Sequence, residues 1–234
     1  MPALDDSTGI TIANSVYSSL EDWGLLDLVQ AVSADTTNAN FGCRNGAAVI
    51  FERMIEKDLL YLACRHHIME LIIGAAFKAK MPDVTGPNVP IFVKFRKNWS
   101  EMDTTQVQHG LTDLEPELKQ EIPNVVKFIK EHLEKQQPRD DYKELLMLSL
   151  MFLDAADEPI RLMKPGACHH ARWMAKTNYA LKIYLLRKPF DLTASEVEDF
   201  YSVSKFIVFV YIRAWFAAPL AICAPFNDLQ LLKN

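Results

Sequence analysis

The order of apolar and polar positions at the start of the chain predicts a helix followed by a strand. Apolar residues recur at helical spacing from Ile12 to Trp23, which predicts a helix with one buried face. Thr8 is a suitable cap for its start, and Gly24 for its end. The short apolar run 28–32 predicts a strand that is buried on both faces.

The next segments continue this alternation up to about residue 80. Apolar positions over 47–55 have helical spacing, residues 59–63 form a second strand-like run, and another apolar helix begins near His66. Strands that alternate with helices in this way predict an α/β unit. The proline-rich segment 81–90 predicts a loop, which we place at a domain edge.

The remainder of the chain has mainly helical patterning. We therefore predict two parts, an α/β core over 1–80 and a helical region over 81–234. The polar segment 101–123 is expected to be partly irregular. The predicted helices cover 91–99, 125–135, 142–153, a segment that ends near 187, and a last one that begins near 193.

The last helix contains the most apolar stretch of the chain, residues 206–226. Thr193 and Glu196 have the spacing of a capping box at its start. The apolar stretch is long enough to suggest a membrane span. However, Arg213 lies in its middle, and Pro219 and Pro225 interrupt it. We therefore predict a buried helix of a bundle and no membrane insertion.

The composition bears on possible binding partners and on the cellular compartment, but it does not alter the predicted fold. The chain has 234 residues, of which 50% are hydrophobic and 24% charged, and a net charge of −5. DNA-binding proteins usually show a basic balance or a basic stripe, so bulk charge does not indicate DNA binding. The four cysteines lie far apart, which predicts reduced thiols in an intracellular protein.

Asp35 is the first candidate functional residue, because it directly follows the strand at 28–32. Ligands and metals in α/β folds gather at the carboxyl ends of strands. The residues after Asp35 are turn and cap formers, Thr36, Thr37, Asn38 and Asn40. Two interpretations follow: Asp35 is a metal ligand, or it is a cap or turn residue.

Two short motifs further along the chain contain the other candidates. Cys64 and His67 have C-x-x-H spacing at the end of the second strand, and Arg172 and Trp173 precede a helix. From the residues alone, Trp173 is interpreted as part of the helical packing, with Arg172 paired to an acid. Cys64, His66 and His67 together with Cys168, His169 and His170 also have the residue types of a zinc site.

In this order, these motifs resemble the catalytic core of hAT-family DNA transposases. In that family the second catalytic acid follows a strand in a D-N-A-S-N-like context, a later strand ends in C-x-x-H, and a T-R-W-N-like motif lies in a helical insertion. This chain has Asp35-Thr36-Thr37-Asn38-Ala39-Asn40 at the first of these positions, and Cys64 and His67 match the second. Arg172 and Trp173 match the central letters of the third, whereas Ala171 and Met174 depart from its flanks.

The resemblance implies a partial RNase H-like α/β core followed by a mainly helical insertion. It implies that Asp35 is one of three carboxylates that hold divalent metal, Mg²⁺ in a complete enzyme, and that Arg172 and Trp173 contact transposon-end DNA. Cys64 and His67 are expected to be structural, with Cys64 buried. A nuclear location and homo-oligomers also agree with the resemblance.

Of the family's three catalytic carboxylates, only the second has a counterpart in this sequence, which is Asp35. We therefore expect a fragment or domesticated remnant of a cut-and-paste transposase that is inactive alone, so whether the chain is an enzyme stays open. The alternative is a non-enzymatic helical interaction protein that kept the transposase fold.

Overall fold

The computed structural model describes residues 6–85, 89–112, 114–166, 173–219 and 221–233. The chain forms two compact units. The α/β unit consists of the residues up to Ile68 together with Ala218–Asp228, and the helical unit of Met69–Ala217 with the residues from Leu229. Each unit is described by itself.

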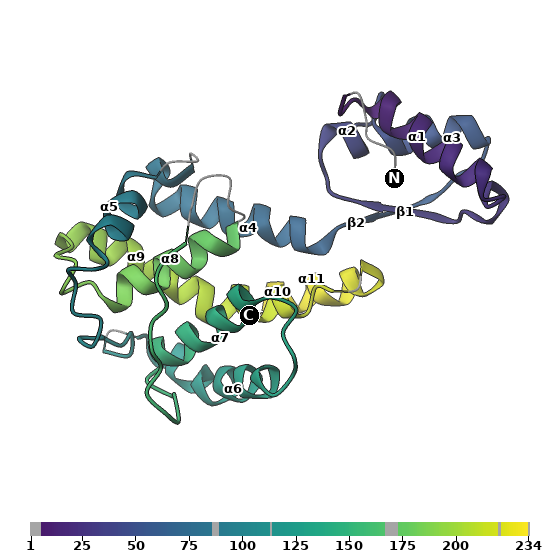
Figure 1. Ribbon diagram of the computed structural model, residues 1–234. Coiled ribbons are helices and arrows are strands. Elements are labelled where there is room, and N and C mark those ends of the chain that lie inside the picture. The colour runs from purple at the N-terminus through teal and green to yellow at the C-terminus, as the bar shows by residue number, and fades with distance from the viewer. Residues whose placement is uncertain (1–5, 86–88, 113, 167–172, 220, 234) are drawn as a thin grey trace. The chain divides into compact units, whose positions relative to one another are not determined.

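The α/β unit contains two parallel strands joined by helices (Figure 1). In this sheet β1 pairs with β2 so that Ala31 lies opposite Leu60 and Ala34 opposite Ala63. A parallel pair requires a helical crossover, which α2 and α3 supply. The elements up to this point are α1 (Gly9–Asp22), the 3₁₀ turn η1 (Leu26–Leu28), β1 (Ala31–Ala34), α2 (Asn38–Phe41), α3 (Ala47–Ile55) and β2 (Leu60–Ala63).

A small apolar core joins α1 and α3 to one face of the strands. Its buried centre is Ala13, Ala47 and Phe51, around which half-buried side chains such as Val16 and Val32 pack. Thr8 caps α1 by accepting a hydrogen bond from the Thr11 backbone N–H, as the sequence predicted.

Two details of this unit differ from the sequence prediction. The first strand runs over Ala31–Ala34 and not over 28–32, because Leu28 belongs to the 3₁₀ turn η1. Its residues alternate between exposed and half-buried instead of being buried on both faces. The reason is that α1 and α3 pack against one face only. Trp23, predicted to lie on the buried face of the first helix, is 68% exposed, because α1 ends at Asp22. Gly24 takes the left-handed conformation (φ +66°) that ends this helix.

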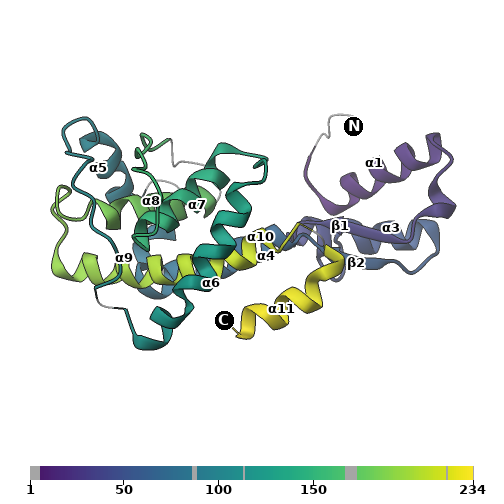
Figure 2. The same ribbon diagram turned by 90° about the horizontal axis from the view of Figure 1, so that it is seen from below.

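The helical unit is built on a series of helices connected by loops of different length (Figures 1 and 2). Helix α4 starts in the α/β unit and continues into the helical unit, and α11 likewise includes residues of both. The remaining elements are α4 (Arg65–Lys80), η2 (Pro82–Thr85), α5 (Pro90–Asn98), α6 (Pro116–Leu133), α7 (Asp140–Phe152), α8 (Trp173–Leu185), α9 (Ala194–Phe206), the π-helical η3 (Ile207–Tyr211), α10 (Ile212–Phe216), η4 (Ala221–Cys223) and α11 (Ala224–Lys233).

Helix α8 lies at the centre of this unit, between α7 and α9. Nearly all of its residues are buried, including Lys176, Asn178 and Lys182. A helix that is buried on all sides must pair its polar groups inside the protein, because an unpaired buried charge is costly. The contacts of these polar residues are therefore part of the fold.

The predicted last helix is confirmed, including its capping box between Thr193 and Glu196. It runs as α9, η3 and α10 to Phe216, and Arg213 pairs with Glu121 at 3.1 Å. In the part of the chain that the structure describes, no helix combines the length and apolarity needed to span a membrane.

Other predictions required correction or refinement. The segment 101–123 is partly irregular, as expected, whereas the helix predicted over 125–135 begins earlier, because α6 starts at Pro116 and contains Pro123. Pro116 suits the first turn of a helix, where its missing N–H is not needed. The division between the two units falls within α4, at Ile68, and not at residue 80, and Ala218–Asp228 belong to the α/β unit. The mixed α/β and helical fold class is confirmed at this coarse level.

Candidate functional site at the end of β1

Asp35 lies where the sequence placed it, directly after β1. Its Oδ1 accepts hydrogen bonds from the Thr37 backbone N–H (3.0 Å) and from Asn40 Nδ2 (2.8 Å). Hydrogen bonds from the Thr37 side chain and backbone lower the pKa of Asp35, with smaller contributions from Asn40 and from the charge of His67. These contacts favour the ionised carboxylate. They are also the contacts of a turn residue that fixes the loop into α2.

The second strand ends at the same edge of the sheet, because the strands are parallel. The Cys64 backbone N–H donates to the Ala34 carbonyl (2.8 Å), so Cys64 is next to the end of β1. His67 lies in the first turn of α4, near enough to act on the pKa of Asp35. The fold thus gathers Asp35, Cys64 and His67 at one edge.

Cys64 is a free thiol that is half-buried and not fully buried as expected. The difference follows from its position after the last residue of a short strand, where fewer side chains cover it. His67 is also half-buried.

The geometry does not add further acidic ligands around Asp35. Within the described residues, no group of three or more His, Cys, Asp and Glu side chains is placed to hold a metal ion. Of the alternative zinc site, Cys168, His169 and His170 lie outside the described residues, as does Arg172. A shared site for the two Cys/His clusters therefore stays a prediction.

Sequence reasoning missed a contact at the same strand end, between Arg65 and Asp228. The Arg65 guanidinium is buried and forms an ion pair with Asp228 of α11. The two residues are separated by 163 positions, so no local pattern could indicate the pair. It connects the start of α4 to the last segment of the α/β unit.

Trp173 packs in the helical unit, as the structural interpretation proposed. Its ring lies 5.5 Å from that of Phe77, measured between centroids, and Lys176 Nζ lies 4.2 Å from the Trp173 ring centroid. Helix α4 approaches the Trp173 ring closely at Gly74, since a Cβ on Gly74 would lie 2.9 Å from Trp173 Cζ2. Trp173 is nevertheless only half-buried, so part of its surface is accessible.

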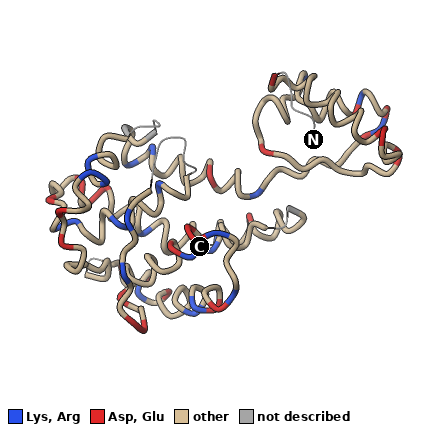
Figure 3. The backbone as a smooth tube through the Cα atoms, viewed as in Figure 1, with Lys and Arg blue, Asp and Glu red and all other residues tan. Residues whose placement is uncertain are grey.

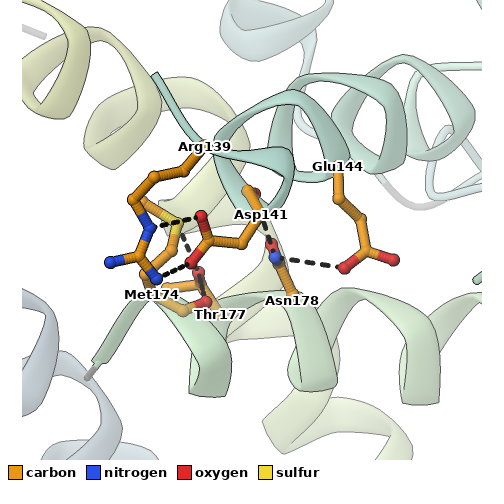
Figure 4. A network of polar contacts seen from close by, with 6 residues as sticks. All are labelled: Arg139, Asp141, Glu144, Met174, Thr177 and Asn178. Carbon is orange, nitrogen blue, oxygen red and sulfur yellow. Dashed lines mark hydrogen bonds and ion pairs between the residues drawn. The ribbon is translucent and has the colours of Figure 1, made fainter. Parts of the chain in front are cut away.

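A polar network that the sequence did not indicate connects the start of α7 to α8 (Figure 4). The Arg139 guanidinium contacts both carboxylate oxygens of Asp141, at 2.9 and 2.6 Å. Asn178 Nδ2 donates to the Asp141 carbonyl (3.1 Å) and to Glu144 Oε2 (3.4 Å), and Lys182 lies 2.6 Å from the other Glu144 oxygen. A cavity of about 270 Å³ adjoins these groups. The network positions α7 against α8.

Charge over the helical unit is mixed. Figure 3 shows basic and acidic positions interspersed along its backbone. The basic residues of α5 include Lys94, whose Nζ lies 5.1 Å from the Phe190 ring centroid. Mixed charge gives a weaker attraction for the DNA backbone than a basic stripe does. Comparison of the chain with models of protein families, with curated proteins and with solved structures found no match.

Proposed function

We propose that this chain is a remnant of a hAT-like cut-and-paste transposase, with an RNase H-like α/β unit and a helical insertion. The observation that carries this proposal is the position of Asp35. Its carboxylate follows the first of two parallel strands, and Cys64 and His67 follow the second. This is the order in which the resemblance expects the second catalytic acid and the C-x-x-H motif.

Asp35 has the chemistry of a ligand for a divalent ion such as Mg²⁺, a hard cation that prefers oxygen. Its pKa is lowered, so the carboxylate is ionised at neutral pH. Its Oδ1 accepts the hydrogen bonds from the Thr37 backbone N–H and from Asn40 Nδ2. When bound, metal in such enzymes activates water and stabilises the leaving oxygen of a phosphodiester.

One carboxylate is too few to clamp two metal ions. We therefore propose that the chain alone does not cleave or join DNA, and that any remaining DNA contact is made by the Arg172–Trp173 motif. The proposed DNA contact is supported by the exposed part of Trp173, since an aromatic ring can stack on an unpaired base. A nuclear location and self-association would accompany this function.

The second candidate, a non-enzymatic interaction protein with this fold, has an observation of its own. The hydrogen bonds from Thr37 and Asn40 give Asp35 a complete structural role in the loop after β1. A carboxylate that is needed for the turn does not require a metal to explain its position.

Manganese binding separates the two candidates. NMR spectra of the full chain should show Mn²⁺ broadening that is strongest for the amide of Thr37 and is lost in Asp35→Asn. Asp27→Asn is the matched control, because Asp27 also belongs to the segment around β1 but precedes the strand. Absence of broadening around Thr37 would reject Asp35 as a ligand and favour the interaction protein.

Nicking of supercoiled and hairpin DNA tests the proposed inactivity. The chain should leave both substrates intact in Mg²⁺ and in Mn²⁺. Metal-dependent nicking that disappears in Asp35→Ala would overturn the proposed inactivity.

A further inference from the structure

The outer edge of β1 carries backbone groups that no strand pairs in the described part of the chain. The Leu60 N–H donates to the Gln30 carbonyl, and the Cys64 N–H to the Ala34 carbonyl. In a parallel ladder the alternate residues of a strand point their N–H and C=O groups to the same side. The backbone N–H and C=O groups of Val32 therefore point toward β2, as those of Gln30 and Ala34 do. Those of Ala31 and Ser33 point to the outer edge.

An apolar groove of about 520 Å³ adjoins this edge. Residues 30–34 form one wall of the groove, and α1 and α3 form the others, with Ile12 and Val16 from α1 and Phe51 from α3. Among the described residues, those of β2 do not line it. The groove is thus on the unpaired side of β1, on the face of the strand that α1 and α3 cover.

We propose that this edge binds an extended strand of another polypeptide, with large apolar side chains at alternate positions. The backbone of that strand pairs with Ala31 and Ser33, which point to the outer edge. Successive side chains of a strand point to opposite faces, so every second one enters the groove and packs against α1 and α3. Addition of a strand to an exposed sheet edge is a common mode of peptide recognition. The inference rests on this edge and groove and does not require the proposed function.

A second copy of the chain is a poor occupant. If two β1 strands paired edge to edge, the positions that enter the groove would be Gln30, Val32 and Ala34. Val32 already packs in the core of its own unit, and the other two are a small side chain and a polar one. The groove would stay largely unfilled, and unfilled apolar space is destabilising.

Binding of a model strand to the full chain tests the proposal. The probe is a labelled peptide of about eight residues in which isoleucine alternates with lysine, a length typical of a strand. We expect saturable binding, with slower amide exchange at Ala31 and Ser33 but not at Ala63. Two versions of the peptide carry N-methyl groups on one or the other set of alternate residues. The version that loses the N–H groups facing β1 should bind at least about tenfold more weakly than the version methylated on the opposite edge, because its pairing donors are removed.

Two pairs of variants locate the binding. Ser33→Pro removes a donor from the outer edge of β1 and should weaken binding at least about tenfold, whereas Ala63→Pro removes one from the other edge of the sheet and should not. Ile12→Lys places a charge in the groove and should also weaken binding, whereas Asn14→Lys changes an exposed residue of α1 and should not. The second pair leaves the backbone intact, so it remains informative if a proline variant does not fold.

Three results would overturn the proposal. The first is no binding of the alternating peptide at about 1 mM, the weak end of specific affinities. The second is binding that is equal in Ile12→Lys and Asn14→Lys. The third is self-association of the chain that Ile12→Lys abolishes, which would assign the edge to a second copy.

Discussion

Lys182 Nζ lies 2.6 Å from a carboxylate oxygen of Glu144 inside the helical unit, and the two side chains are only 3% and 13% exposed. Burial lowers the pKa of Lys182, while the charge of Glu144 and its hydrogen bond act in the opposite direction. A buried ion pair of this kind is weak evidence of net stabilisation, yet either charge alone is costly. The pair joins α7 to α8, the two helices that the polar network of Asn178 also connects.

Removal of the cation should therefore destabilise the protein strongly. Lys182→Met leaves the Glu144 carboxylate buried without its partner and should lower the free energy of unfolding by about 3–5 kcal/mol, measured by urea denaturation. Lys130→Met is the matched control. Its ion pair with Asp157 lies at the surface and should contribute less than about 1 kcal/mol. The double variant Lys182→Met/Glu144→Gln should regain much of the loss, and failure to regain any would show that packing, not charge, dominates.

The acid stability of the α/β unit should depend on Asp35. Its folded pKa lies below the ordinary value of 3.8, so its contribution is present above that pH and is lost as the pH falls through the lowered pKa. Asp35→Asn, which cannot titrate, should remove this part of the pH dependence. Thermal unfolding between about pH 2 and pH 5 measures it, and an unchanged profile would contradict the assignment.

The capping box at the start of α9 should contribute measurably to stability. Thr193→Ala removes the acceptor for the Glu196 backbone N–H and should cost about 0.5–2 kcal/mol. Ser195→Ala is the control, because Ser195 is exposed and should change stability by less than about 0.5 kcal/mol. Equal effects of the two substitutions on urea unfolding would show that the cap is not needed.

The close approach of Gly74 and Trp173 predicts a coupled pair of substitutions. Alanine normally favours a helix over glycine by about 0.8–1 kcal/mol, but a Cβ at Gly74 would lie 2.9 Å from Trp173 Cζ2. Gly74→Ala should therefore destabilise the wild-type protein and stabilise the Trp173→Ala variant. A double-mutant cycle by urea unfolding measures the coupling, and additive effects would contradict the contact.

Binding of single-stranded DNA tests the proposed role of Trp173. At low salt, Trp173→Ala should weaken binding by about 1–3 kcal/mol, the value of one stacked base. Trp99→Ala is the matched control, since Trp99 is also half-buried and packs edge-on against Phe95. Fluorescence anisotropy measures affinity, and circular dichroism checks the fold. Equal loss in both variants, or no DNA binding by the parent chain, would reject the base-stacking role.

Local sequence patterns predicted most elements because their causes lie within a few residues. Thr8, Gly24 and the Thr193–Glu196 pair act on the backbone next to them, so the sequence alone indicates where these helices begin or end. The same is true of Asp35, which follows a short apolar run and is held by Thr37 and Asn40 nearby. The order of helices and strands in the α/β unit was likewise predictable from periodicity.

The burial of each element was decided by packing between distant segments, which local patterns do not encode. Val32 is covered on one side because α1 and α3 pack on one face of β1, and Trp23 is exposed because α1 ends before it. The pairs Arg65–Asp228 and Lys182–Glu144 form only when distant helices meet. The sequence by itself determined where chain segments turn, begin and end, because these depend on neighbouring residues. Tertiary structure alone decided which charges are buried together and which edge of β1 stays open, because these depend on contacts across the chain.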